Sequence, residues 1–113
     1  AKEHGKQNAV EGLIREGEKV VVVEDLISTG GSSLKVVDTL KEQNIDVLGL
    51  VAIFTYNFES AVKAFEDKGV KFYTLTDYNT LIEVALEKNY ITKEELDILK
   101  EWRKNPKEYY ANI

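Results

Sequence analysis

The stretch KVVVVEDLISTGGSS, residues 19–33, decides the fold of this chain. Its four consecutive valines, residues 20–23, form an uninterrupted β-branched run, which is typical of a strand buried on both faces of a parallel sheet. Two acids follow, and then six consecutive Ser, Thr or Gly residues at 28–33. Apolar residues then recur at helical spacing to about Glu42: Leu34, Val36, Val37 and Leu40. The stretch therefore predicts a strand, a small-residue loop and a helix in direct succession.

Strands and helices also alternate along the rest of the chain. Further strands are expected at 9–14, 47–54 and 70–75, with a turn at 15–18 that joins the first of them to the valine run. Three more helices are expected: one capped by Asn57 and ended by Gly69, one around 81–86, and one that starts at a capping box at 92–95 and stops at Pro106.

This alternation predicts an α/β fold. Strands joined through helices form parallel sheets by right-handed crossovers. We therefore expect a mostly parallel sheet with helices on both faces, and a ligand site beyond the carboxyl ends of the strands. No linker, repeat or shift in composition divides the sequence, so residues 1–113 are predicted to be a single domain. The sequence contains no methionine, and we expect it to be a fragment of a longer chain.

The composition excludes several classes of protein. Hydrophobic residues make up 43% of the chain and charged residues 31%, which argues against disorder. There is no cysteine, so disulfide bonds, thiolate metal sites and a cysteine nucleophile are excluded. The formal net charge of -5 has the wrong sign for a broad nucleic-acid surface, and no apolar run is long enough for a membrane span. We expect a cytoplasmic protein that binds neither nucleic acid nor membrane.

The loop at 28–33 has the chemistry of a phosphate site. A helix N-terminus presents unpaired backbone N–H groups and partial positive charge. Gly30 and Gly31 would let that backbone approach a ligand closely, and hydroxyl groups add donors at Ser28, Thr29, Ser32 and Ser33. Small residues are also ordinary in a loop between a strand and a helix, so taken alone the two glycines favour a purely structural role.

The acid pair Glu24 and Asp25 changes that balance. Two carboxylates at the end of a strand can accept hydrogen bonds from the two hydroxyls of a ribose, or face Mg²⁺. Side-by-side acids repel each other unless a cation or a hydroxyl donor lies between them. The acids and the loop together predict a site for a ribose phosphate.

Other phosphate and hydrolase motifs are absent from the sequence. A P-loop needs a lysine directly after its second glycine, whereas Gly31 is separated from Lys35 by three residues. The G-x-G-x-x-G spacing of dinucleotide-binding folds and the G-x-S-x-G elbow of hydrolases do not occur. The only histidine, His4, lies in a polar opening segment, which disfavours a Ser-His triad or a histidine-rich metal site.

Residues 20–32, VVVVEDLISTGGS, resemble the phosphoribosyl pyrophosphate (PRPP) signature of the type I phosphoribosyltransferases. Residues 2–5, KEHG, resemble the K-x-H-G part of the mobile catalytic loop in the orotate phosphoribosyltransferase family. Residues 51–56 and 72–86 also resemble bacterial members of that family. The resemblance covers nearly the whole chain and implies the core of a type I phosphoribosyltransferase, which is Rossmann-like.

The resemblance implies transfer of phosphoribosyl from PRPP to orotate, which gives orotidine 5′-monophosphate and pyrophosphate in pyrimidine biosynthesis. By position, Lys2, His4 and Asp25 match catalytic residues. Residues that match the substrate-binding positions are Glu24 and Asp25 for the ribose hydroxyls, Ser28 near the base, Thr29, Gly30, Gly31 and Ser32 for the 5′-phosphate, and Lys2 and His4 for the pyrophosphate.

The resemblance also implies Mg²⁺ carried by PRPP near Glu24 and Asp25, and a homodimer in which the mobile loop reaches the neighbouring subunit's site. Family members are longer at the amino end, and some carry an orotate-contacting arginine where residues 53–57 have none. We therefore expect this fragment to be inactive alone. Two alternatives stay open: a non-catalytic PRPP-binding regulator, which Lys2 and His4 disfavour, and a purine phosphoribosyltransferase.

Overall fold

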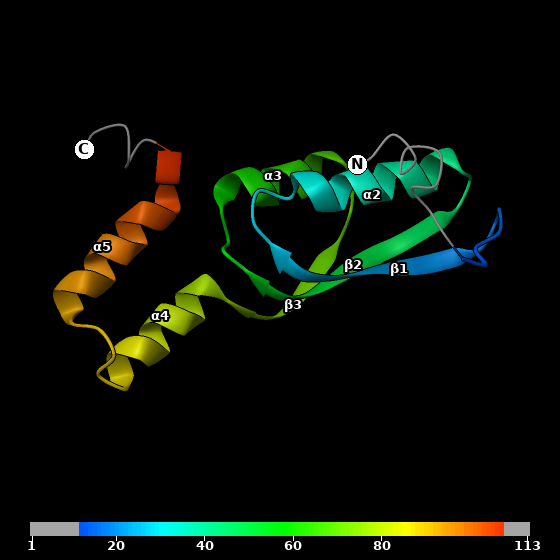
Figure 1. Ribbon diagram of the computed structural model, residues 1–113. Coiled ribbons are helices and arrows are strands. Elements are labelled where there is room, and N and C mark those ends of the chain that lie inside the picture. The colour runs from blue at the N-terminus through cyan, green and yellow to red at the C-terminus, as the bar shows by residue number, and fades with distance from the viewer. Residues whose placement is uncertain (1–11, 108–113) are drawn as a thin grey trace.

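Three parallel strands form the centre of the computed structural model, which describes residues 12–107 (Figure 1). They are β1 (Lys19–Ile27), β2 (Asp46–Thr55) and β3 (Phe72–Asp77), in the spatial order β1-β2-β3. The predicted strands of the valine run and of 47–54 are confirmed. The third strand starts two residues later than expected, because Val70 is buried in the core whereas pairing with β2 begins at Phe72.

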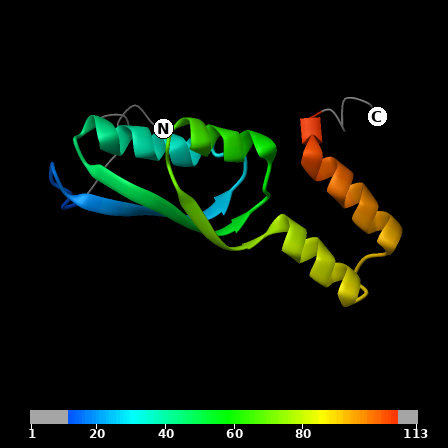
Figure 2. The same cartoon turned by 180° about the vertical axis from the view of Figure 1, so that it is seen from behind.

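Two helices cover one face of this sheet. The connections β1 to β2 and β2 to β3 pass through α2 (Gly31–Glu42) and α3 (Glu59–Asp67), which lie on the same side in both views (Figures 1 and 2). The exposed Lys68 Nζ of the α3 C-cap contacts Asp38 Oδ2 of α2 at 2.9 Å. Between sheet and helices lies the main core, which includes the fully buried side chains of Ile27, Val37, Leu50 and Phe65.

The opposite face of the sheet is open within residues 12–107. Side chains alternate between the two faces along a strand, and the outward set is apolar and exposed: Val21, Val23, Val51, Ile53, Tyr73 and Leu75. Val23 is 76% exposed and Leu75 is 84% exposed. The expectation of helices on both faces is therefore wrong for the described residues, since α2 and α3 pack on the same side. A continuous apolar run predicts burial of both strand faces, but it does not say which residues bury them.

The last two helices form a hairpin beyond the carboxyl ends of the strands. They are α4 (Tyr78–Glu87) and α5 (Lys93–Lys104), and they project from the sheet in both views (Figures 1 and 2). Their own small core consists of Tyr78, Ile82 and Leu96. Trp102 and Tyr56 pack against both this core and the main one. The hairpin is thus attached to the sheet mainly through aromatic side chains.

Most helix ends lie where the sequence predicts them. The capping box is present at Thr92 and Glu95, and Gly69 adopts positive φ directly after α3. Asn57 does not cap α3 as expected: it takes a left-handed conformation with a φ of 59, and Phe58 is the N-cap. Residues 12–14 of the expected strand at 9–14 are not extended in a sheet, and 9–11 lie outside the described residues. None of the helices described at 12–107 has the length and apolarity of a membrane span.

Candidate functional site

The loop between β1 and α2 lies at the carboxyl edge of the sheet, where the sequence predicted a ligand. Ser28 and Thr29 are exposed, and Gly30 is buried with φ 87. A Cβ atom on Gly30 would lie 2.9 Å from Phe65 Cε2 of α3. Because left-handed backbone and this close approach both disfavour a side chain, glycine is required here. The packing of Gly30 on α3 fixes the height of the loop above the sheet.

The start of α2 has no side-chain cap among the described residues. The first helical hydrogen bond runs from Leu34 N to Gly30 O at 2.9 Å, so the N–H groups of residues 31–33 precede the helical ladder. Gly31 and Ser32 are exposed, whereas Ser33 is 1% exposed and buried in the core. The backbone donors and the hydroxyl of Ser32 are therefore available to an anion, and the Ser33 side chain is not.

The acids Glu24 and Asp25 lie inside β1 rather than at its end, because the strand continues to Ile27. Consecutive residues of a strand point to opposite faces, which corrects the expectation that the two carboxylates lie side by side. Glu24 is half-buried and Asp25 is exposed. Residues 12–107 contain no group of three acids or histidines placed to hold a metal ion. The two carboxylates thus lie on different faces of β1, and repulsion between them no longer argues for a ligand.

Two predicted catalytic residues, Lys2 and His4, lie outside the described residues. Of the predicted site residues, the structure describes the acids and the loop, which lie within residues 24–32.

A polar network at the ends of β2 and β3 was not foreseen. Asn57 N donates to Thr55 Oγ1 at 3.1 Å, and Arg103 Nη1 of α5 donates to Asn57 O at 2.7 Å. Asp77 caps α4 by accepting a hydrogen bond from Thr80 N at 2.8 Å. This bond, helped by the side chains of Thr80 and Asn57, holds the pKa of Asp77 below its usual value although partial burial raises it. No sequence pattern links Arg103 to Asn57, since 46 residues separate them.

Aromatic rings fill the space beside this network. Tyr56 stacks on Phe58 with ring centroids 5.1 Å apart, and both contact Trp102 of α5 edge-on. Burial raises the pKa of the Tyr78 hydroxyl, with a further contribution from Tyr56, while Arg103 lowers it. Trp102 Nε1 is the buried side-chain polar atom of the described residues that has no hydrogen-bond partner. Trp102 thus packs within the helical hairpin and against Tyr56, just after the end of β2.

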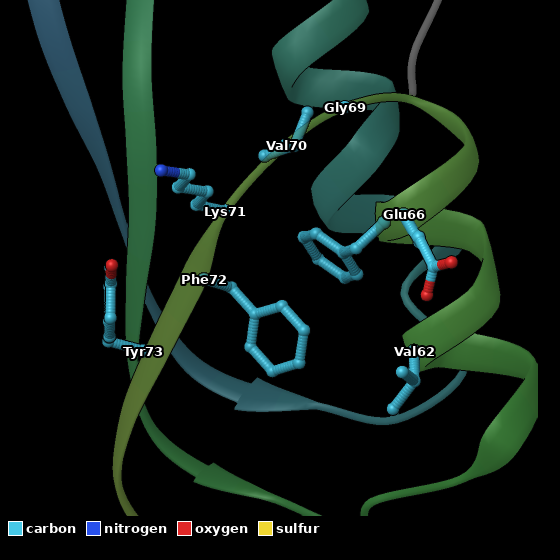
Figure 3. Close-up of a pocket in the computed structure, with 8 residues that line it drawn as sticks. Val62, Glu66, Gly69, Val70, Lys71, Phe72 and Tyr73 are labelled. Atoms are coloured by element: carbon cyan, nitrogen blue, oxygen red, sulfur yellow. The ribbon is translucent and has the colours of Figure 1, made fainter.

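A hollow at the outer edge of the sheet is lined mainly by apolar side chains. It has a volume of about 430 Å³ and lies between α3 and β3 (Figure 3). The rings of Phe65 and Phe72 approach each other there, with centroids 4.7 Å apart, and Glu66 and Lys71 line its rim. Its residue Phe65 also packs on Gly30 of the β1–α2 loop, but the lining includes no residue that the sequence assigned to the site.

Comparison with known proteins gives one family. Residues 3–89 match the model of the phosphoribosyl transferase domain. Orotate phosphoribosyltransferase of Listeria innocua is 58% identical over 106 residues, which cover 94% of this chain and 51% of that protein. The enzyme of the same name from Cytophaga hutchinsonii is 51% identical, over 93% of this chain and 50% of that protein. The chain thus spans about half the length of these curated relatives.

Solved structures agree on the fold. Orotate phosphoribosyltransferase of Mycobacterium tuberculosis, in a complex with 5-phospho-α-D-ribosyl 1-diphosphate, aligns with a TM-score of 0.55 at 28% identity over 59% of this chain and 40% of that chain. UMP synthase of Leishmania donovani aligns with a TM-score of 0.70 at 24% identity over 86% of this chain and 22% of that chain. The predicted α/β fold of a type I phosphoribosyltransferase core is confirmed.

Proposed function

We propose that this chain, which belongs to the phosphoribosyl transferase domain family, is the PRPP-binding part of an orotate phosphoribosyltransferase. The reaction breaks the bond between the anomeric carbon of PRPP and a pyrophosphate oxygen, and forms a bond from that carbon to a ring nitrogen of orotate. Pyrophosphate leaves with the electron pair of the broken C–O bond, and the proton on the orotate ring nitrogen is released to solvent or to pyrophosphate. The identity of 51–58% to curated orotate enzymes supports orotate as the acceptor over a purine base.

One observation carries the proposal: the start of α2 has unused backbone donors and lies just after the acids of β1. Backbone N–H groups of Gly31 and Ser32 would bind the 5′-phosphate, helped by the exposed hydroxyl of Thr29. Glu24 or Asp25 would accept hydrogen bonds from the ribose hydroxyls. Ser28 would lie near the base. This arrangement holds the sugar at both ends, so the anomeric carbon is left to react.

Lys2 and His4 complete the proposal. Positive charge develops on the ribose ring and negative charge on the leaving pyrophosphate, so cations beside the leaving group stabilise the transition state. We assign Lys2 and a protonated His4 to that role. Closure of their loop would also exclude water that competes with orotate for the activated sugar.

Mg²⁺ fits the donor set of the site. Magnesium is usually bound by one or two carboxylates together with substrate phosphates, and Glu24 or Asp25, which lie on opposite faces of β1, would supply one of them. When bound with PRPP, Mg²⁺ would neutralise charge on the pyrophosphate. A homodimer, in which the loop with Lys2 and His4 serves the partner's site, and a cytoplasmic location are further parts of the proposal.

A chimera tests this function directly. The 106 residues of the Listeria innocua relative that align with this chain are replaced by the chain itself, so that the rest of the enzyme is present. Pyrophosphate release is measured with PRPP and Mg²⁺, using orotate, hypoxanthine and adenine as acceptors. We expect turnover with orotate alone. The unmodified chain of 113 residues is assayed in parallel, and we expect no turnover from it.

The Asp25→Asn chimera is the matched variant, because it removes the charge and keeps the size of the side chain. We expect at least tenfold weaker PRPP binding by calorimetry. Release of pyrophosphate with a purine but not with orotate would overturn the assignment of orotate as the acceptor. PRPP binding without any transfer, in a chimera whose parent enzyme is active, would indicate the regulator instead.

A further inference from the structure

A second feature of the carboxyl edge is a cleft of about 550 Å³ between the start of α3 and the end of α5. Thr29 of the β1–α2 loop forms part of its wall, so the cleft adjoins the proposed phosphate site. The polar residues that line it are Thr29, Glu59, Ser60, Arg103, Lys104, Asn105 and Lys107. Neither the acid pair nor the residues assigned to PRPP, apart from Thr29, belong to it.

The cleft is positively charged in an otherwise acidic protein. Three cationic side chains, Arg103, Lys104 and Lys107, face one carboxylate, Glu59, whereas the whole chain carries a formal charge of -5. The start of α3, which forms the opposite wall, has no side-chain cap among the described residues. Backbone N–H groups and the positive end of the α3 dipole therefore add to the same field.

Arg103 is held with its guanidinium at this cleft. Its Nη1 donates to Asn57 O at 2.7 Å, and the half-buried residue lines the cleft together with Phe58. That bond uses one of the five N–H donors of a guanidinium. An arginine fixed by one donor is preorganised, so it loses little freedom when other donors bind a planar anion.

Stabilisation of the α5 C-terminus explains only part of this cluster. Basic residues near a helix C-terminus interact favourably with its dipole, and Lys104 also contacts Glu101 at 3.6 Å. Lys107, however, lies outside α5, in a further helical stretch at 106–107, and Arg103 reaches across to the β2–α3 loop. Both cations line the cleft.

We propose that this cleft binds an anionic group, a carboxylate or a phosphate, with Arg103 as the main donor and Lys104 and Lys107 as flanking charges. If the proposed function holds, the anion belongs to the acceptor or to a phosphate of the sugar donor, since Thr29 joins the two sites. The charge of the cleft does not depend on that function.

Titrations of the 113-residue chain followed by amide and arginine side-chain NMR signals test the proposal. The probes are pyrophosphate, ribose 5-phosphate and orotate, each added separately without metal. We expect the Arg103 Nε–H signal to shift with at least one probe, and Arg103→Gln to lower that affinity about tenfold. Shifts with orotate alone assign a carboxylate site, and shifts with the phosphates assign a phosphate site.

A double variant guards against loss of the α5 anchor in Arg103→Gln. Lys104→Gln with Lys107→Gln leaves the bond from Arg103 to Asn57 in place, and we expect about threefold weaker binding. The matched control is Lys88→Gln with Lys93→Gln, which removes the same charge at the far end of the same hairpin. Equal weakening of anion binding in both double variants would overturn the proposal that the cleft binds an anion. So would unchanged affinity in Arg103→Gln with a native circular dichroism spectrum.

The two proposals can fail separately. Loss of PRPP binding in Asp25→Asn, with no effect of Arg103→Gln on any probe, rejects the cleft and keeps the proposed function. Binding of pyrophosphate that depends on Arg103, in a chimera that neither binds nor turns over PRPP, keeps the cleft and rejects the function.

Discussion

Helices α2 and α5 begin in opposite ways. At α5, the Thr92 Oγ1 accepts a hydrogen bond from Glu95 N at 3.1 Å, and Glu95 Oε1 accepts one from Thr92 N at 2.9 Å. At α2, no side chain of the described residues closes the start, and the N-cap is a glycine. The same backbone groups are thus satisfied internally at one helix and left open at the other. The open start is the one beside the acids of β1, where a ligand gains the most from it.

The largest expected effect on stability is that of replacing Gly30, the N-cap residue of α2. Gly30→Ala should lower the free energy of unfolding by about 3 kcal/mol, because its φ of 87 is left-handed and its Cβ would collide with Phe65, which is 1% exposed. Gly17→Ala is the control: φ is 86 and nothing lies within 4 Å of its Cβ. It should cost about 1 kcal/mol. Urea denaturation measures both, and equal costs would contradict the packing argument.

The closed helix start should behave as a purely structural feature. Thr92→Ala removes the capping box of α5 and should lower the free energy of unfolding by about 1 kcal/mol. Affinity for ribose 5-phosphate should stay unchanged, because the cap lies at the far end of the hairpin. Thermal denaturation and calorimetry on the same samples check both statements. A loss of affinity without a loss of stability would blur the distinction between the two starts.

Helix α4 is also capped by a side chain, that of Asp77, and this cap should make the free energy of unfolding depend on pH. Its pKa is lowered in the folded chain, so its contribution is present above the ordinary carboxyl pKa and is lost as the pH falls through the lowered value. The Asp77→Asn variant keeps a side chain that can cap α4, but this side chain does not titrate. We expect the wild type to exceed this variant in stability by a few tenths of a kcal/mol near pH 6, and the difference to vanish toward pH 2. Parallel urea titrations at the two pH values measure it.

The smallest effect on stability should come from the open start. Thr29→Ala should change the free energy of unfolding by less than about 0.5 kcal/mol, because the side chain is exposed and caps nothing in the described structure. Affinity for ribose 5-phosphate should fall by about threefold to tenfold. Calorimetry gives the affinity and urea denaturation the stability. A fall in stability equal to that of Thr92→Ala would show that α2 is capped after all.

Local patterns predicted the local structure well. The valine run, the loop at 28–33 and the box at Thr92 each concern residues near one another in sequence, where strand propensity and capping chemistry act directly. The acids and the loop were likewise found from the sequence. The contact from Arg103 to Asn57 was not, because it depends on how the hairpin docks on the sheet. The relation of the two acids was also misjudged, since it depends on where β1 ends.

The bare side of the sheet has a calorimetric consequence. Heat capacity rises on unfolding because apolar surface becomes hydrated. Side chains such as Val23 and Leu75 meet water already in the folded chain, so they add little to that rise. The heat capacity change per residue should therefore fall below the usual 12–15 cal/mol/K, roughly the range for ordinary domains. The stability of this chain would then vary less steeply with temperature than its size implies, and its cold denaturation would lie further from the accessible range.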